Sequence, residues 1–411
     1  MCVGVYYLPP VYERMAWRVA AVRAEITYAL NPPEEIIFLP NEVAQMEAIV
    51  AATLQAMETS TTTPPTPTLE ILDMFDATAT ATIIPTPLPA SVELGGVMHQ
   101  YQRWNNCGPA TLSMGLSYWG WVGTQYITAE FLKPNERDVN VMPYEMGAFV
   151  EQETELHAVV RVGGDLDLIK NLIANGFPVI LEKGFEQANF NGWMGHYSLI
   201  TGYDDGLQLF NSQDSFNGSD FKISYERALK DWQAFNYTFI LIYSSELEAK
   251  AMAALGQWAD EAWAVDHALE IANQQIGVKS GRELYFAWYN KGTNHNTRRE
   301  YSDAAFAYNF AFVLYSQLEE DIRPWRMVWY QTGPYKAYYN TQQYQEVINL
   351  ANTTLFAMSE SVLEESYYWR GLAKEALGDI DGAISDFRRS IQLNANFSLG
   401  WVALNRLGVS S

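Results

Sequence analysis

The run NNCGPATLSMGLSYWG at residues 105–120 has the features of a short helix with a reactive N-terminal end. Asn105 or Asn106 suits the N-cap position, Pro109 suits the first turn, and a glycine closes the run. Cys107 then lies at the N-terminal tip, where unpaired amide groups and the helix dipole favour the thiolate. Because the thiolate is the nucleophilic form of cysteine, the run predicts a catalytic nucleophile.

A second run, GHYSLITGYDDG, predicts a strand that ends in a tight turn, because β-branched residues precede an Asp-Asp-Gly sequence. If Tyr203 pairs with Leu207 across a three-residue turn, paired positions sum to 410, and His196 stands opposite Asp214. Asn211 lies three residues from that position, about 10 Å along the strand. We therefore expect Asp214 to orient His196, with Asn211 as the reserve.

A thiol, an imidazole and a carboxylate in the chain order Cys107, His196, Asp214 form a set suited to acyl transfer. The imidazole would take the thiol proton and later protonate the leaving amine, while the carboxylate would hold the imidazole tautomer. The developing oxyanion needs hydrogen-bond donors. The Cys107 amide supplies one donor, and the side chain of Gln102 is the expected second, with Gln100 close enough to compete. This chemistry requires no cofactor and no metal.

The combination of an upstream glutamine, a CGP helix start, a GHY strand and an aspartate after the next strand resembles the papain-like double-glycine peptidases, which trim bacteriocin leader peptides. The likeness covers residues 97–245. It implies an α+β papain-like cysteine peptidase domain whose site is formed by Gln102, Cys107, His196 and Asp214. It also implies peptide-bond hydrolysis through an acyl-enzyme on the cysteine.

The loop that precedes the strand histidine is rich in large apolar residues, among them Phe185, Phe190 and Trp193. Two uses of this loop stay open. It either lines a substrate cleft or packs as part of a hydrophobic core.

Residues 246–411 have apolar positions at helical spacing throughout. The run YYWRGLAKEALGDIDGAISDF places an aromatic residue, Gly371, an alanine and Phe387 at offsets 4, 8, 20 and 24 of a tetratricopeptide unit. The residues around Gly292 fit the same register, and those around Gly333 fit it more loosely. The resemblance implies an all-α tetratricopeptide superhelix whose groove binds a peptide or partner protein. A packing or spacer array is the alternative.

Composition narrows the function further. The 411-residue chain has a formal charge of −22, which argues against a nucleic-acid partner, since such binding depends on basic residues that neutralise phosphates. Two cysteines cannot build a disulfide framework or a cysteine-rich metal site. The five histidines show no HExxH spacing, and no run of about 18 apolar residues predicts a membrane span.

Two segments precede the domain that carries the cysteine. Residues 1–58 predict helices over 11–30 and 41–57, and their apolar start is either the tail of a membrane anchor that begins upstream or a plain apolar end. Residues 59–92 contain ten Thr and six Pro but no Gly, Lys or Arg, which predicts a semi-extended linker. Because Thr/Pro stalks are commonest on exported proteins, we expect an extracytoplasmic bacterial protein, with an internal spacer as the alternative.

These features together predict an exported cysteine peptidase that hydrolyses a peptide or protein substrate and carries helical repeats for a protein partner. Two alternatives stay open. The first is a catalytically inactive peptidase fold that serves with the repeats as a peptide-binding or protein-binding scaffold. The second is a different acyl transfer on the same three residues.

Overall fold

The structure is a computed structural model that describes residues 32–41, 43–60, 87–186 and 192–409, with a few isolated residues before residue 32. The helix predicted over 11–30 lies largely outside the described residues, as does most of the Thr/Pro-rich stretch. The second predicted helix is present as α3 (Val43–Ser60). Among the described residues, no helix has the length and apolar character needed to cross a membrane.

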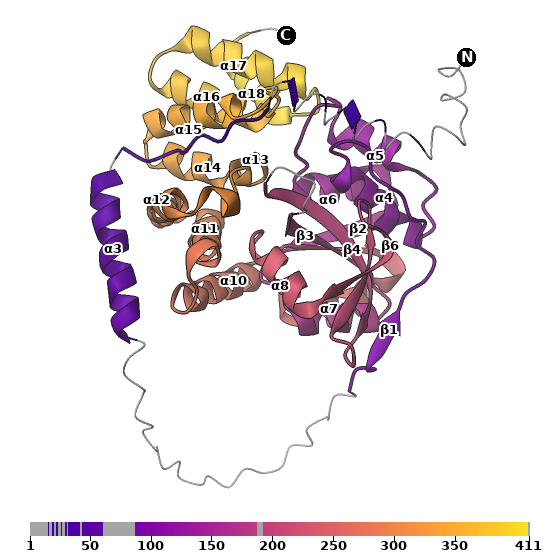
Figure 1. The fold of residues 1–411 in the computed structure, drawn as a ribbon. Coiled ribbons are helices and arrows are strands. Elements are labelled where there is room, and N and C mark those ends of the chain that lie inside the picture. Colours follow the sequence, from indigo (N-terminus) through magenta and orange to yellow (C-terminus); the bar gives the residue numbers. More distant parts are fainter. Residues whose placement is uncertain are drawn as a thin grey trace.

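A seven-stranded sheet forms the centre of the domain that carries Cys107 (Figure 1). Its strands are β1 (Ser91–Glu93), β2 (Leu156–Arg161), β3 (Val179–Phe185), β4 (Met194–Asp204), β5 (Leu209–Asp214), β6 (Gly218–Ser224) and β7 (Phe239–Ser244). The order is β2-β7-β3-β4-β5-β6, with β1 paired to the end of β4, and all pairs are antiparallel. The sheet thus begins at Ser91, six residues before the predicted domain start at 97.

Helices cover both faces of this sheet. They are α4 (Cys107–Tyr118), α5 (Gln125–Leu132), α6 (Pro143–Glu153), α7 (Leu166–Ala174) and α8 (Tyr225–Gln233). Alternate residues of one strand point to opposite faces, so Ile180 packs in the core beneath α4 and α6 while Leu181 packs in the core beneath α7. The result is a central strand, β3, that is buried along its whole length.

After β7 the described chain is helical. Its helices are α9 (Glu248–Leu255), α10 (Glu261–Ile276), α11 (Gly281–Thr297), α12 (Tyr301–Gln317), α13 (Met327–Tyr330), α14 (Gly333–Asn340), α15 (Tyr344–Phe356), α16 (Glu364–Ala376), α17 (Ile380–Leu393) and α18 (Ser398–Arg406), with short 3₁₀ turns at Ser245–Leu247, Gly256–Ala259 and Glu320–Ile322. Figure 1 shows these helices stacked beside the sheet domain.

Glycines allow two of the helix pairs to approach closely. A Cβ atom added to Gly371 would lie 2.7 Å from the ring of Phe387, and one added to Gly292 would lie 2.8 Å from the ring of Tyr308. Both pairs are 16 residues apart, the separation that the repeat register predicts between offsets 8 and 24. Gly333 instead lies against the hydroxyl of Tyr308, so the third copy departs from this geometry.

The loop before His196 joins the sheet domain to the helical region. Trp193 is only 3% exposed and stacks on Phe235 with ring centroids 5.7 Å apart. Arg326, from the helical region, donates a hydrogen bond to the carbonyl of Trp193 (2.9 Å). Of the two uses expected for this loop, packing is therefore the one that Trp193 serves, while Phe190 lies outside the described residues.

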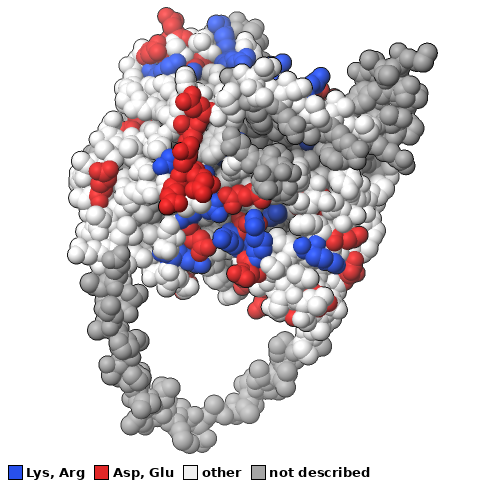
Figure 2. Space-filling view, in the orientation of Figure 1, with Lys and Arg blue, Asp and Glu red and all other residues white. Residues whose placement is uncertain are grey.

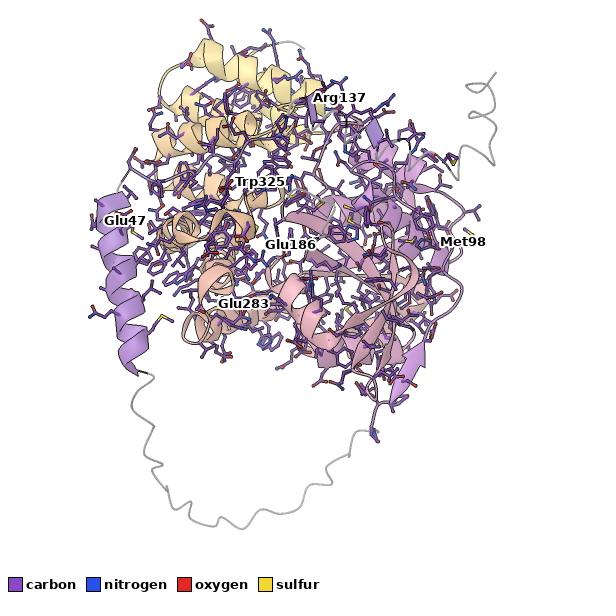
Figure 3. All side chains as sticks on the ribbon, viewed as in Figure 1. Glu47, Met98, Arg137, Glu186, Glu283 and Trp325 are labelled. Atoms are coloured by element: carbon purple, nitrogen blue, oxygen red, sulfur yellow. The ribbon has the colours of Figure 1, made fainter. Side chains whose placement is uncertain are left out.

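Further polar contacts lie where the two regions meet. Arg282 of α11 forms an ion pair with Glu186, which follows β3 and is labelled in Figure 3 near Trp325.

On the face shown in Figure 2, the coloured Lys and Arg residues lie among Asp and Glu and form no continuous basic stripe.

Candidate active site

Helix α4 begins at Cys107, as the sequence predicts. Asn106 occupies the N-cap position, and its carbonyl accepts a hydrogen bond from the amide of Ala110 (2.9 Å). Its side chain does not cap the helix but donates to Gln125 Oε1 (3.3 Å). The amides of the first turn therefore have no side-chain acceptor from the N-cap, which leaves them suited to a bound anion or oxyanion.

Cys107 is partly exposed, and the group with the strongest favourable effect on its thiolate is His196. Burial raises the pKa of this thiol, whereas the interaction with His196 and its positive charge lower it. The backbone amide of Tyr197 and the ammonium of Lys133 lower the pKa further, so that its net value lies below that of an ordinary thiol. The surroundings thus favour a thiolate facing an imidazolium.

His196 lies on β4 and is bonded to a carboxylate on its other side. Its Nε2 atom is 3.1 Å from both Oδ1 and Oδ2 of Asp214, which leaves Nδ1 for the cysteine. Phe185 packs against the imidazole with ring centroids 4.6 Å apart. Burial lowers the pKa of His196, but the charge and hydrogen bond of Asp214 outweigh it and raise the pKa to about 9.

Asp214 is completely buried, and several groups keep it ionised. Burial by itself raises the pKa of this carboxyl, but the charge and hydrogen bond of His196 hold it well below its usual range. Oδ2 accepts a hydrogen bond from the Ser198 hydroxyl (2.8 Å), and Oδ1 accepts one from the backbone amide of Asn217 (2.8 Å). The Lys183 ammonium lies 3.9 Å from Oδ2.

The structure brings Asp214 to His196 by a different register from the one predicted. Tyr203 pairs with Phe210, not with Leu207, because the turn between β4 and β5 is longer than three residues. A bulge at residue 201 then shifts the register, so that Leu199 pairs with Gln213. Continuing by one residue places Asp214 opposite Ser198.

Ser198 follows His196 by two residues, and residues two apart in a strand share a face. The aspartate therefore reaches the histidine diagonally, which the bonds from both Ser198 and His196 to its carboxylate reflect.

Asn211, the reserve candidate, lies elsewhere. It pairs with Gly202, and its Nδ2 atom donates to Glu93 Oε1 (2.9 Å) on the side of β1. The structure does not bring its side chain to His196.

The two glutamines differ in their surroundings. Both side-chain ends of Gln100 are occupied by helix contacts: Nε2 donates to Ser113 Oγ (2.6 Å), and Oε1 accepts from the amide of Gln125 (2.9 Å). Gln102 is held next to the aspartate by Ser215. Its side-chain Oε1 accepts a hydrogen bond from the Ser215 hydroxyl (2.8 Å), and its backbone N–H donates one to the Ser215 carbonyl (2.8 Å). This leaves the donor end of Gln102 for an oxyanion.

A buried lysine that the sequence analysis did not single out lies beside the cysteine. The Lys133 ammonium donates to the carbonyls of Asn105 (3.1 Å) and Asp138 (2.8 Å), and the residue is 3% exposed. Asn105 has a φ of +54°, a left-handed conformation that needs support in a non-glycine residue. Lys133 therefore steadies the turn that leads into Cys107.

A second buried group flanks the sheet side of the cysteine. Glu182 pairs with Tyr197 across β3 and β4, and the Tyr197 hydroxyl donates to Glu182 Oε1 (3.1 Å). Burial raises the pKa of Glu182 well above its ordinary value, and the nearby cysteine raises it further. Burial therefore disfavours the ionised form of Glu182, the form that would oppose a thiolate at Cys107.

Carboxyl groups from both regions gather on the far side of Lys133. Asp138 and Glu145 belong to the sheet domain, and Glu364 and Glu365 form the first turn of α16. Asn140 donates to Glu365 Oε1 (3.3 Å) across the boundary. Burial raises the pKa of each of these four carboxyls. The start of α16 thus meets the candidate site through a buried acidic cluster.

One group of side chains among the described residues could share a metal ion, and it lies away from this site. It consists of His295, Glu300 and Asp303 at the junction of α11 and α12. Glu300 is already hydrogen-bonded to His295 (2.6 Å) and to Arg298 (3.0 Å), which makes an ion-pair cluster a sufficient account of it.

Comparisons with known proteins give a family match to the sheet domain. Residues 95–240 match the family model described as the Peptidase_C39 like family. A crystal structure of a C39-like peptidase from Bacillus anthracis is similar at 18% sequence identity and a TM-score of 0.32, covering 38% of this chain and 98% of that one. No curated protein matches the chain.

Proposed function

We propose that the protein is an exported cysteine peptidase that hydrolyses peptide bonds through an acyl-enzyme on Cys107. The observation that carries this proposal is that His196, which lowers the pKa of the Cys107 thiol, bonds through Nε2 to the buried Asp214 carboxylate. The match of residues 95–240 to a peptidase family supports it.

In the proposed reaction, the Cys107 thiolate attacks the carbonyl carbon of the scissile bond, forming a C–S bond. The negative charge moves to the carbonyl oxygen, where the Cys107 amide and Gln102 Nε2 donate hydrogen bonds. The imidazolium of His196 then gives its proton to the leaving nitrogen as the C–N bond breaks.

The thioester is next hydrolysed. His196, now neutral, takes a proton from water, and the hydroxide attacks the thioester carbon. The C–S bond breaks, which releases a carboxylic acid and restores the thiolate–imidazolium pair. Asp214 remains ionised throughout and stabilises the imidazolium.

We assign the helical region the role of binding a peptide or partner protein, as a tetratricopeptide array. The contacts of Gly371 with Phe387 and of Gly292 with Tyr308 support the repeat assignment, because they occur at the offsets that define the unit. The extracytoplasmic bacterial location rests on the Thr/Pro-rich composition of residues 59–92.

A peptide-library digestion tests the hydrolytic function. We expect products in the full chain and none above background in Cys107→Ala or His196→Ala. Product formation that is equal in all three proteins would contradict the proposal. Transfer of the acyl group to an added amine, without hydrolysis, would assign the triad to a different acyl transfer.

A further inference from the structure

An extended segment of the N-terminal region lies across the helical region. Residues 32–40 have no regular secondary structure and run over the helices before α3 begins, as Figure 1 shows in indigo. Contacts here join residues about 300 positions apart in sequence. The backbone amide of Asn41, directly after the segment, donates to Glu346 Oε1 (3.0 Å). This part of the chain is therefore bound to the helical region.

The segment is bound through some of its side chains and exposes others. Glu34, Ile37 and Leu39 are exposed, whereas Phe38 and Pro40 are buried and Glu35 is mostly covered. Exposed and buried side chains alternate over residues 37–40, as in an extended peptide, and Glu35 is covered three positions before Phe38.

One subsite takes an aromatic ring. Phe38 is 7% exposed and meets the edge of Phe312 at a centroid distance of 5.0 Å, with Tyr338 at 6.3 Å. Both partners belong to the core of the helical region, on α12 and α14. Such a ring pocket supplies most of the contact area in a short peptide interface.

A second subsite takes a carboxylate. Glu35 Oε1 accepts a hydrogen bond from the Tyr315 hydroxyl (2.5 Å) and lies 3.4 Å from Arg323 Nη1. Glu35 and Arg323 are only 16% and 17% exposed at their side chains, so this ion pair is screened less than a surface pair. The site therefore recognises an acidic residue placed three positions before an aromatic one.

We infer that the helical region carries a peptide-binding site formed by Phe312, Tyr315, Arg323 and Tyr338, and that residues 35–40 of this chain are its resident, exchangeable ligand. The inference rests on the binding role proposed for the helical region and needs no peptidase activity. The external ligand that fits this site is a peptide with an acidic residue, an aromatic residue three positions later and a proline two positions after that.

The connecting chain makes exchange physically reasonable. A linker whose length matches the span between its ends holds a tethered ligand at an effective concentration on the order of millimolar. A site of only micromolar intrinsic affinity is then filled almost completely by its own segment. A free peptide of the same chemistry competes once the tether is cut or once its concentration exceeds the effective one.

The test uses the full chain with Cys107→Ala, so that peptidase activity plays no part. A recognition sequence for a site-specific protease is placed between Thr68 and Leu69, and a fluorescent peptide of residues 32–60 is added before and after the tether is cut. We expect saturable binding after the cut, and binding at least about tenfold weaker before it.

Matched peptides test the two subsites. We expect Glu35→Gln and Phe38→Ala to weaken binding by about tenfold or more, and the controls Glu34→Gln and Leu39→Ala to change it by less than about twofold. Equal binding of all four peptides would overturn the assigned subsites. Failure of the labelled peptide to exchange into the cut chain would overturn the inference, because the segment would then be a permanent part of the fold.

Discussion

Asp214 places both carboxylate oxygens 3.1 Å from His196 Nε2 although it stands opposite Ser198 in the sheet. The diagonal contact depends on two features, the bulge at residue 201 and the Ser198 hydroxyl that holds Oδ2. A neutral amide at position 214 would keep the shape of the site but lose the charge that raises the pKa of His196.

Asp214→Asn therefore lowers the rate of peptide hydrolysis by about 10²-fold or more. It also lowers the pKa of His196 from about 9. Loss of the imidazolium limits the rate at high pH, so the basic limb of the pH–rate profile moves to lower pH. The control Asn211→Ala keeps the profile of the parent chain. A shift of the basic limb in Asn211→Ala, with none in Asp214→Asn, would assign the third role to Asn211.

Gln102→Ala lowers kcat by about 10²- to 10³-fold, because it removes a donor to the oxyanion. It leaves the pH dependence of Cys107 alkylation unchanged, since Gln102 is not one of the groups that shift the pKa of the thiol. Gln100→Ala acts mainly on stability and less on kcat. It removes hydrogen bonds to Ser113 and Gln125, so it lowers the melting temperature by several degrees with a smaller effect on kcat. A large loss of kcat in Gln100→Ala, with a lower melting temperature but little loss of kcat in Gln102→Ala, would make Gln100 the donor.

Lys133→Met moves the alkylation midpoint of Cys107 to higher pH, since the Lys133 charge lowers the pKa of that thiol. It also lowers stability by about 1–3 kcal/mol, because the carbonyls of Asn105 and Asp138 lose a buried donor. Lys170→Met is the matched control, as Lys170 bonds to Asp167 and Asp205 instead. Identical alkylation midpoints in the two variants would exclude an electrostatic role for Lys133.

The buried acidic cluster makes the packing of α16 sensitive to pH. Burial raises the pKa of Glu365 well above 4.5, so the folded chain holds a proton that the unfolded chain releases. Stability from this group is complete below about pH 4.5 and decreases as the pH rises above it.

Glu365→Gln keeps a neutral side chain at every pH, so it reduces the fall in melting temperature between pH 5 and pH 8 relative to the parent chain. Glu360→Gln is the control, because its ion pair with Arg137 is exposed. An equal pH dependence in Glu365→Gln and the parent chain would contradict this account.

Local signals explain what the sequence predicted well. The start of α4 at Cys107 follows from a proline in the first turn. Its end follows from Gly120, which has a φ of +83° just beyond the helix. These are short-range preferences that act within a few residues.

Long-range contacts explain what it missed. The distance from Lys133 to the turn at Asn105 depends on how α5 packs, and no local pattern encodes it. The predicted hairpin register was wrong because the turn is longer than three residues, so that Tyr203 pairs with Phe210, and because a bulge follows at residue 201. Asp214 still lies on the same face of the sheet as His196. The contact of Glu35 with Tyr315 joins positions 280 residues apart.

The central claim is that Cys107 and His196 form a reactive pair, and iodoacetamide uptake against pH tests it most directly. The measurement uses Cys2→Ser, which leaves Cys107 as the sole thiol, with and without His196→Ala. The account predicts rapid uptake well below the free-thiol pKa of about 8.5, lost in His196→Ala. Slow uptake that follows an ordinary thiol and is unchanged by His196→Ala would contradict it.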